Sequence, residues 1–316
     1  MSGAGGPAPI EGGGARVESP RFTILTTSLN QADYLAATIR SVAEQRRPDV
    51  EHLVLDGGST DGSVDILRAM DSSLAYWVSA PDGGQPAALN AGLRRARGSL
   101  VAFLNSDDLY LPGALDHIAT LADLHPAAEW LVGGTIYFGE GSGDNWHEGK
   151  TPTSVSDVLF FDAYAPQPGH FWRREVFDRV GTFDESLDYG FDFDFMVRCA
   201  IAGVVPVASA RPVAAFRFHG ASKTMAARDR QHSDTAIVQE RWFGEACRLD
   251  GGRVAHRARA RYHGHLALGA ARDERRAGRT PDGWRTLAAA VRRYPTMLRT
   301  RAFVGTVQRL LGLRDD

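Results

Sequence analysis

Two adjacent carboxylates behind an apolar run form the first group of residues that could do chemistry. Residues 99–104 are almost continuously apolar, and Asn105, Asp107 and Asp108 follow directly. Neighbouring acids repel each other and lose hydration. A hard divalent cation relieves both costs, since Mg²⁺ is typically held by one or two carboxylates together with phosphate oxygens of a substrate. The alternative is an Asx turn that caps the helix expected after Pro112.

A glycine-rich loop is the second group. Residues 51–56 have the alternation of a strand, and the loop 57–61 connects them to an expected helix. Glycines let a ligand approach the backbone, and the Asp56 carboxylate can accept hydrogen bonds from a nucleobase or a ribose. The loop is neither a P-loop nor a dinucleotide fingerprint, because the lysine and the glycine spacing are absent. The alternative is an ordinary strand-to-helix turn.

Acids among aromatic residues form the third group. In residues 187–198 the side chains of Asp188, Asp192 and Asp194 alternate with tyrosine and phenylalanine. A carboxylate in an apolar wall has a raised proton affinity and can serve as a general base. The alternative is that these acids only cap the helix that starts there.

A loop that carries cations and hydrogen-bond donors is the fourth group. Residues 217–224 contain Arg217, His219, Ser222, Lys223 and Thr224. Such a loop can hold a phosphate group, and the alternative is a solvated loop without a ligand.

Strand and helix patterns alternate through the first part of the chain. The expected strands are 21–27, 51–56, 75–79 and 99–104, separated by helices at 33–45, at 63–70 and around Leu89 and Leu93. This alternation predicts an α/β fold with a mostly parallel sheet and right-handed crossovers. Ligands of such sheets bind at the carboxyl ends of the strands, where the polar clusters lie.

The later part of the chain has a mixed pattern that becomes helical toward its end. Helices are expected at 112–124, 173–180 and 192–202, strands at 129–138 and 212–218, and further helices from about Ala226 onward. We therefore expect a disordered tail over 1–20, a catalytic domain over 21–245 and an Arg-rich helical extension over 246–316.

Composition excludes several classes of protein. The chain has 316 residues, of which 43% are hydrophobic and 23% charged, as in ordinary globular proteins. Cys199 and Cys247 lie far apart, which excludes a disulfide framework and a cysteine zinc site and fits a reducing compartment. The longest apolar run, residues 199–210, is too short to span a membrane, and residues 1–20 lack the apolar core of a signal peptide. These features predict a cytoplasmic protein.

The charges are distributed unevenly. Residues 245–316 carry sixteen arginines, no lysine and seven acids, a net charge of +9, so the rest of the chain carries −11. This asymmetry suggests either a peripheral contact with the inner face of an anionic membrane or arginines on the solvated faces of packed helices. Apolar residues at helical spacing could serve either purpose: Trp284, Leu287, Val291, Phe303, Val307 and Leu310.

In their order along the chain, these motifs resemble the family 2 glycosyltransferases. The resemblance extends over about residues 21–224 and rests on the segments 24–30, 56–61, 88–92, 104–108 and 191–194. It implies a GT-A fold, which is Rossmann-like with a mostly parallel central sheet and flanking helices. It also implies a nucleotide-sugar donor, a divalent metal (Mg²⁺ or Mn²⁺) and inversion at the anomeric carbon.

The resemblance also implies roles for individual residues. Asp107 matches the metal-binding acid, and His219 matches a loop position that can approach the metal or the diphosphate. Asp192 matches the catalytic base, with Asp194 as the alternative. The expected donor-binding residues are Thr27, Asn30, Asp56, Asn90 and Asn105.

Two departures from the family pattern accompany these roles, and one segment is assigned to the acceptor. Asn105 stands where the family usually has the first aspartate of its D-x-D motif, so we expect it to contact ribose or metal-bound water. Leu29 replaces a common aromatic residue. Residues 167–171 are expected to line the acceptor side.

The resulting interpretation is an inverting, metal-dependent glycosyltransferase involved in polysaccharide biosynthesis. Its donor is expected to be a UDP-linked nucleoside-diphosphate sugar and its acceptor a glycan or lipid-linked hydroxyl, and no nucleic acid partner is expected. One alternative is a sugar-nucleotide nucleotidyltransferase, which needs an early basic triphosphate loop that residues 26–30 do not provide. Another is a non-catalytic nucleotide-sugar-binding protein of the same fold, although Asp107 and Asp192 are both present.

Overall fold

The chain forms two compact units. The structure, a computed structural model, describes residues 8–140, 146–148, 150–161, 166–220, 228–295, 298 and 301–311. The first unit comprises Met1–Pro152 and Ala163–Glu240, and the second comprises Thr153–Asp162 and Arg241–Asp316. The division lies five residues before the expected boundary at 245, and a short segment from the middle of the chain joins the helical unit.

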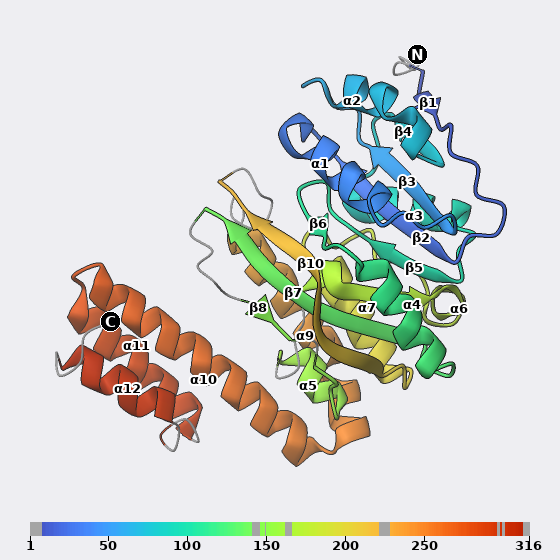
Figure 1. The fold of residues 1–316 in the computed structure, drawn as a ribbon. Coiled ribbons are helices and arrows are strands. Elements are labelled where there is room, and N and C mark those ends of the chain that lie inside the picture. Colours follow the sequence, from blue (N-terminus) through green and yellow to red (C-terminus); the bar gives the residue numbers. More distant parts are fainter. Residues whose placement is uncertain are drawn as a thin grey trace, which may run out of the picture. The chain divides into compact units, whose positions relative to one another are not determined.

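The first unit is an α/β structure (Figure 1). Its strands are β1 (Ile10–Gly12), β2 (Phe22–Ser28), β3 (Val50–Asp56), β4 (Tyr76–Ser79), β5 (Leu100–Phe103), β6 (Leu109–Tyr110), β7 (Trp130–Gly139), β8 (Trp146–His147), β9 (His170–Arg173) and β10 (Pro206–Phe218). Its helices are α1 (Ala32–Ala43), α2 (Ser63–Ala69), α3 (Gln85–Arg95), α4 (Ala114–Leu124), α6 (Arg174–Val180), α7 (Phe191–Ile201) and the first half of α9 (Arg228–Asp250), with 3₁₀ turns η1 (Asp71–Ser73) and η2 (Gln167–Gly169).

One mixed sheet runs through this unit. Among the described residues its order is β1-β4-β3-β2-β5-β9-β7-β10-β6, with β8 on β7. Strands β2, β3, β4 and β5 are parallel to their neighbours in this group, as the alternation of strands and helices predicted. The strand β9 enters antiparallel between β5 and β7, and β6 pairs antiparallel with β10.

The parallel strands are buried on both faces, because successive side chains point to opposite faces of the sheet and helices cover both faces. A Cβ built on Gly92 of α3 would lie 2.9 Å from Leu25 and 3.1 Å from Leu55, so these leucines face α3. The neighbouring Val54 packs instead with Leu35 of α1 and other residues of α1, α2 and β4. This double cover fixes the strands, and therefore the positions of the loops at their carboxyl ends.

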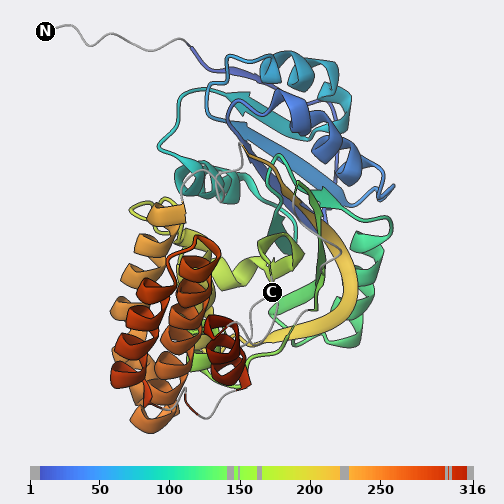
Figure 2. The same ribbon diagram turned by 90° about the vertical axis from the view of Figure 1, so that its left-hand side faces the viewer.

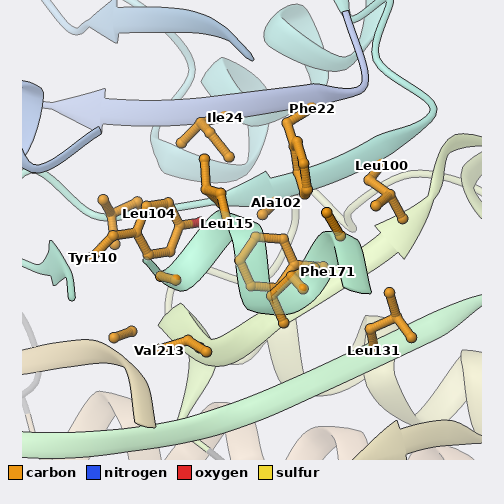
Figure 3. Close-up of a cluster of buried hydrophobic side chains, with 14 of the residues drawn as sticks. Phe22, Ile24, Leu100, Ala102, Leu104, Tyr110, Leu115, Leu131, Phe171 and Val213 are labelled. Atoms are coloured by element: carbon orange, nitrogen blue, oxygen red, sulfur yellow. The ribbon is translucent and has the colours of Figure 1, made fainter. Parts of the chain in front are cut away.

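A second cluster fixes β5 and the turn that follows it. The ring of Phe171 on β9 lies 6.3 Å from Phe22 in an edge contact and 5.7 Å from Tyr110, on which it stacks. Figure 3 shows these rings with Leu104 and Leu115 in the same cluster. Because Leu104 is fully buried here, it anchors the start of the polar turn that contains Asn105 and Asp107.

The expected disordered tail is wrong for part of its length. Residues Ile10–Gly12 form β1, which pairs antiparallel with β4 through Ile10–Ser79 and Gly12–Trp77. Gly13 N donates a 2.7 Å hydrogen bond to Asp71 Oδ1. The glycines allow this approach, because a Cβ on Gly12 would lie 2.5 Å from Asp71 Oδ1. Composition could not show this, since the pairing partner is distant in sequence.

The second unit consists of helices. It contains α5 (Val155–Leu159), the end of α9, and α10 (Gly252–Arg276), α11 (Thr280–Arg293) and α12 (Arg301–Leu310). Its core is formed by Leu268, Ala271, Leu287, Ala290 and Leu310. The helix α5 belongs to it because Asp250 accepts hydrogen bonds from Val155 N at 3.1 Å and Ser156 N at 2.6 Å.

Within the part of the chain that the structure describes, no helix combines the length and the apolar character that a membrane span requires.

Candidate active site

The loop after β3 is shaped by the buried carboxylate of Asp56. Its Oδ2 accepts hydrogen bonds from Gly58 N at 3.2 Å, Ser59 N at 2.8 Å and Ser79 Oγ at 2.6 Å, and its Oδ1 accepts from Ser59 Oγ. These donors occupy most of the acceptor capacity of a carboxylate. Asp56 therefore organises the loop, and only its Oδ1 retains capacity for a ligand.

Asn30 and Asp61 tie the loop after β2 to this loop. Asn30 has a left-handed backbone with a φ of 53°. Its N–H donates to Ser59 Oγ at 2.7 Å, and its Oδ1 accepts from Thr60 N at 2.9 Å. Asp61 Oδ2 accepts from Ala32 N at 2.8 Å. Burial acts to raise the pKa of Asp61, but its hydrogen bonds outweigh burial and the pKa is lowered. The carboxylate that accepts from Ala32 N is therefore ionised at neutral pH.

An exposed leucine stands beside the two loops. Thr27 is half-buried near the end of β2, whereas Leu29 is 58% exposed. A Cβ on Gly57 would lie 3.4 Å from Leu29 Cδ1. An aliphatic side chain next to glycine backbone is therefore the apolar surface available here, in place of the aromatic ring that the family pattern suggests.

The turn after β5 exposes Asp107 and buries Asp108. The Asp107 side chain is 18% exposed, and Asp108 is 1% exposed. Burial and then the charge of Asp107 raise the pKa of Asp108 well above its usual value, while Arg217 N donates to its carboxylate at 2.9 Å. Asp107 is thus the accessible carboxylate of the pair.

The pairing of β6 with β10 brings His219 to Asp107. Leu109 is opposite Ala215 in this pairing, so the residues after β10 reach the turn after β5. His219 Nε2 lies 3.0 Å from Asp107 Oδ2, and its buried Nδ1 has no hydrogen-bond partner among the described residues. The ring of Tyr34 on α1 packs on His219, with the centroids 4.3 Å apart.

A fixed cation stands next to this pair. The Arg217 guanidinium lies 5.1 Å from the Tyr34 ring centroid and 4.4 Å from that of Phe138. Its Nε donates to the Asp107 carbonyl at 2.9 Å. The sequence indicated Arg217 but not the two rings that hold it. Ser222, Lys223 and Thr224 of the predicted phosphate-binding loop lie outside the described residues.

The chemistry of the Asp107–His219 pair fits a divalent cation. A carboxylate and an imidazole are both ligands of Mn²⁺-like ions, and Mg²⁺ or Mn²⁺ commonly completes its shell with water and substrate phosphate. Among the residues that the structure describes, no three His, Cys, Asp or Glu side chains are placed to share a metal ion. A cation at Asp107 and His219 would therefore need further ligands from water or a substrate.

Three amide side chains from separate segments meet at Asn105. Gln85 Nε2 donates to Asn105 Oδ1 at 2.9 Å, and Asn105 Nδ2 lies 3.4 Å from both Asp108 Oδ2 and Gln167 Oε1. Gln167 Nε2 donates to the Phe103 carbonyl at 2.6 Å. We refer to Gln85, Asn105 and Gln167 as the amide relay. The relay connects the start of α3 to the predicted acceptor segment. It also explains why residue 105 is an amide, because its NH₂ group faces the oxygens Asp108 Oδ2 and Gln167 Oε1.

Asn105→Asp is therefore expected to destabilise the metal-free protein, although it creates the usual family residue. The new oxygen would face Asp108 Oδ2 and Gln167 Oε1, which should lower the free energy of unfolding by about 1–3 kcal/mol. The folded-state pKa of this new carboxyl would be raised, so the loss should be full at pH 8 and shrink as the pH falls through that pKa. Thermal denaturation of the variant and of wild type, at pH 8 and at a pH below that pKa, measures the loss of stability. Equal melting temperatures at pH 8 would contradict the role of the relay.

Asn90 has a structural position, which corrects its predicted role in donor binding. It is buried, its Nδ2 donates to the Phe183 carbonyl at 3.0 Å and to Glu185 Oε1 at 2.8 Å, and its Oδ1 accepts from Phe183 N at 3.0 Å. The amide is thus committed to joining α3 to the segment before α7.

The two candidate bases have different environments. Asp194 is 1% exposed and pairs with Arg198, whose Nε lies 2.7 Å from Asp194 Oδ2. Asp192 is half-buried, and its Oδ1 accepts a 2.8 Å hydrogen bond from Phe193 N. The start of α7 lies near the end of β5, since the Phe191 and Phe103 centroids are 6.1 Å apart. Of the two carboxylates, Asp192 is the better placed to meet a substrate.

Comparison with known proteins decides the family. The family described as "Glycosyl transferase family 2" matches residues 23–185, which include Asp56, Asn105 and Asp107. This chain belongs to glycosyl transferase family 2. The family resemblance predicted from the motifs is thereby confirmed, and the chain is a glycosyltransferase.

Relatives of this family 2 glycosyltransferase occur in mycobacteria. An uncharacterized glycosyltransferase of Mycobacterium tuberculosis is 33% identical over 187 residues, which is 58% of this chain and 70% of the relative. A glycosyltransferase of Mycobacterium bovis named for PGL/p-HBAD biosynthesis is 30% identical over 185 residues, 57% of this chain and 70% of the relative.

Solved structures show that the family 2 glycosyltransferase has the predicted GT-A fold. A mannosyltransferase from Pyrobaculum calidifontis, solved with GDP-Man and Mn²⁺, has a TM-score of 0.59 at 20% identity and covers 94% of this chain and 81% of its own. TarS 1-349 of S. aureus, solved with UDP-GlcNAc, has a TM-score of 0.57 at 17% identity and covers 89% and 82%. Family and fold together support a glycosyltransferase over the nucleotidyltransferase and the non-catalytic alternatives.

Proposed function

We propose that this glycosyltransferase moves a sugar from a nucleoside-diphosphate sugar to an acceptor hydroxyl with inversion at the anomeric carbon, using a divalent cation. The observation that carries the proposal is the contact between Asp107 and His219 at the carboxyl end of β5. An accessible carboxylate, the guanidinium of Arg217 and an imidazole whose Nδ1 has no partner in the described part of the chain converge there. This combination suits a diphosphate and its cation.

The loops after β2 and β3 form the proposed nucleoside side. Thr27 and Leu29 would contact the nucleoside, while Asn30 and Asp56 hold the loop backbones in place and Asp56 Oδ1 keeps capacity for one donor. Asn105, oriented by Gln85 and Gln167, would contact the ribose or a metal-bound water. We propose a UDP-linked donor, with a GDP-linked donor as the alternative to be tested.

Asp107 would hold the cation, with His219 as its neighbouring ligand. A divalent cation at this place supplies a Lewis acid that neutralises the charge growing on the leaving diphosphate. Arg217 adds a second positive charge that is already fixed by Tyr34 and Phe138 before substrate arrives, so little reorganisation is needed as the bond breaks.

Asp192 would take the proton of the acceptor hydroxyl. Placing the base across the sugar from the leaving group produces a single in-line displacement and inversion, by the geometric rule that distinguishes inverting from retaining enzymes. Of the predicted acceptor segment 167–171, Gln167 would act beside the acceptor through the amide relay, whereas Phe171 is fully buried in the core and would not line the acceptor side. We propose a glycan or lipid-linked acceptor for the biosynthesis of a polysaccharide or glycolipid.

A donor-hydrolysis screen tests this function. The full chain is incubated with UDP- and GDP-linked sugars in Mg²⁺, Mn²⁺ or EDTA, and release of the nucleoside diphosphate is measured. We expect metal-dependent release from a UDP-sugar and, once an acceptor is found, a product of inverted anomeric configuration by NMR. Release that is equally fast in EDTA, or a product of retained configuration, would contradict the mechanism.

A further inference from the structure

The helices α11 and α12, together with residues 298 and 311 that follow them, carry arginines and exposed apolar residues. We refer to Arg292, Arg293, Leu298, Val304 and Leu311 as the α11–α12 surface. All five are exposed, and Leu298, Val304 and Leu311 are 46%, 51% and 57% exposed. Both helices pack on α10 and on each other, and they lie side by side in Figures 1 and 2. The five residues therefore belong to one small helical unit.

The helix α12 is apolar on two sides. Its inner side contributes Leu310 and the half-buried Phe303 and Val307 to the core of the unit. Its outer side carries Val304 and Leu311, which are seven residues apart and therefore lie on one stripe. The core of the unit covers only the inner side of α12, so Val304 and Leu311 remain exposed on its outer side, next to the exposed Gln308.

Exposed apolar residues are concentrated in this unit. Single exposed aliphatic side chains are normal on any protein surface. Of the eleven large hydrophobic residues that are exposed in the described part of the chain, however, six lie in the second unit, which comprises little more than a quarter of the chain: Leu249, Val254, Leu266, Leu298, Val304 and Leu311.

The charge of the unit identifies the chemistry of its partner. The second unit has seventeen arginines, no lysine and nine acids, a net charge of +8. Several acids already pair locally, as Asp282 does with Arg285 and Glu274 with Arg279. No ion pair is found for Arg292 or Arg293 within the described residues. As far as the described residues show, the second unit therefore presents arginines without an acidic partner as well as exposed aliphatic side chains.

We propose that the α11–α12 surface binds the face of an anionic lipid bilayer. Lipid phosphates complement the arginines, and the headgroup–acyl boundary accepts the aliphatic side chains of α12, as it does for interfacial helices. A nucleic acid would use the arginines but leave Val304 and Leu311 uncovered. A second copy docked through the same surface would cover them but would bring two units of charge +8 together. A second copy docked through its acidic first unit, of charge −10, is the competing occupant that the test must distinguish. The bilayer supplies phosphates and an apolar boundary in one partner.

Co-sedimentation of the full chain with vesicles tests the proposal without donor or acceptor, so its outcome is independent of the proposed reaction. Wild type should bind vesicles that contain phosphatidylglycerol at low salt, bind phosphatidylcholine vesicles weakly, and lose binding at high salt. Each of Arg292→Gln and Arg293→Gln should lower the partition coefficient by about fivefold. Val304→Asp with Leu311→Asp should lower it by more than about tenfold.

Matched variants on the first unit separate a specific surface from general charge and hydrophobicity. Leu124→Asp replaces a leucine of α4 that is 70% exposed, and Arg94→Gln replaces an exposed arginine of α3. Both should bind vesicles as wild type does. Circular dichroism checks that each variant is folded. If the double aspartate variant is unfolded, the two arginine variants and the salt series still test whether the α11–α12 surface binds anionic vesicles.

Two results would overturn the proposal. The first is no binding to anionic vesicles at low salt, or equal binding by wild type and the surface variants. The second is a wild-type dimer in light scattering that becomes monomeric in the double aspartate variant, because the surface would then join two copies of this chain.

Discussion

Asp107→Ala is expected to lower donor turnover by more than about a hundredfold. Asp107 is the accessible carboxylate of the turn after β5, and Asp108 cannot replace it, because Asp108 is buried and bonded to Arg217 N. Without the metal-mediated stabilisation of the leaving diphosphate, the activation free energy should rise by several kcal/mol. Each 1.4 kcal/mol lowers the rate by about tenfold. Steady-state release of nucleoside diphosphate over a Mn²⁺ titration measures the effect.

A matched acid separates this effect from a general loss of charge. Asp65 of α2 is exposed and pairs with Arg68 at 2.9 Å, and Asp65→Ala should retain wild-type turnover because exposed pairs contribute little. His219→Ala should raise the Mn²⁺ concentration needed for half-maximal rate if its imidazole is a ligand. Wild-type activity that survives exhaustive EDTA treatment would contradict the assignment of Asp107 as a metal ligand.

The location of the site could be predicted from the sequence because strand ends are local features. A buried apolar run followed by acids indicates where Asp107 is, and alternation of strands and helices indicates that the polar ends of β2, β3 and β5 share one edge. The family resemblance added the order of the motifs, which no single motif provides. The same local signals also predicted α1, α4, α6 and α7 to within a few residues.

The commitments of polar side chains could not be predicted in this way. Asn90 and Asp194 have the same residue types as ligand-binding groups, but one holds Phe183 and the other holds Arg198. A sequence shows which donors and acceptors exist but not which of them are already paired. The pair of Asp194 with Arg198 spans only four residues of α7, so the spacing allowed it, whereas the partner of Asn90 lies 93 positions later in the chain.

The amide relay and the place of α5 in the second unit were missed for the same reason. Gln85 reaches Asn105 across 20 positions and Gln167 reaches it across 62, so neither pairing leaves a local pattern. The short helix α5 looks like part of the catalytic domain in sequence order. It joins the helical unit because Asp250, nearly a hundred positions later, accepts hydrogen bonds from its first turn.

Asp192→Asn is expected to lower kcat by about 10²- to 10⁴-fold, the usual contribution of a general base, while leaving the affinity for donor nearly unchanged. The same substitution two residues later is its matched control. Asp194→Asn breaks the buried pair with Arg198, which should lower the free energy of unfolding by about 3 kcal/mol. The folded fraction of this variant should still turn over donor and acceptor at a rate near that of wild type.

Three measurements on both variants distinguish a base from a structural acid: kcat with saturating donor and acceptor, donor affinity by calorimetry, and thermal denaturation. Asp192 accepts a hydrogen bond from Phe193 N at the start of α7, and asparagine keeps that acceptor, so Asp192→Asn should melt close to wild type. A variant that folds normally, binds donor and fails to react has lost a chemical group rather than its structure. If Asp194→Asn instead loses kcat at unchanged stability, Asp194 is the base. In that case the pairing with Arg198 must open during the reaction, because a carboxylate held by a guanidinium cannot take the proton of an acceptor hydroxyl.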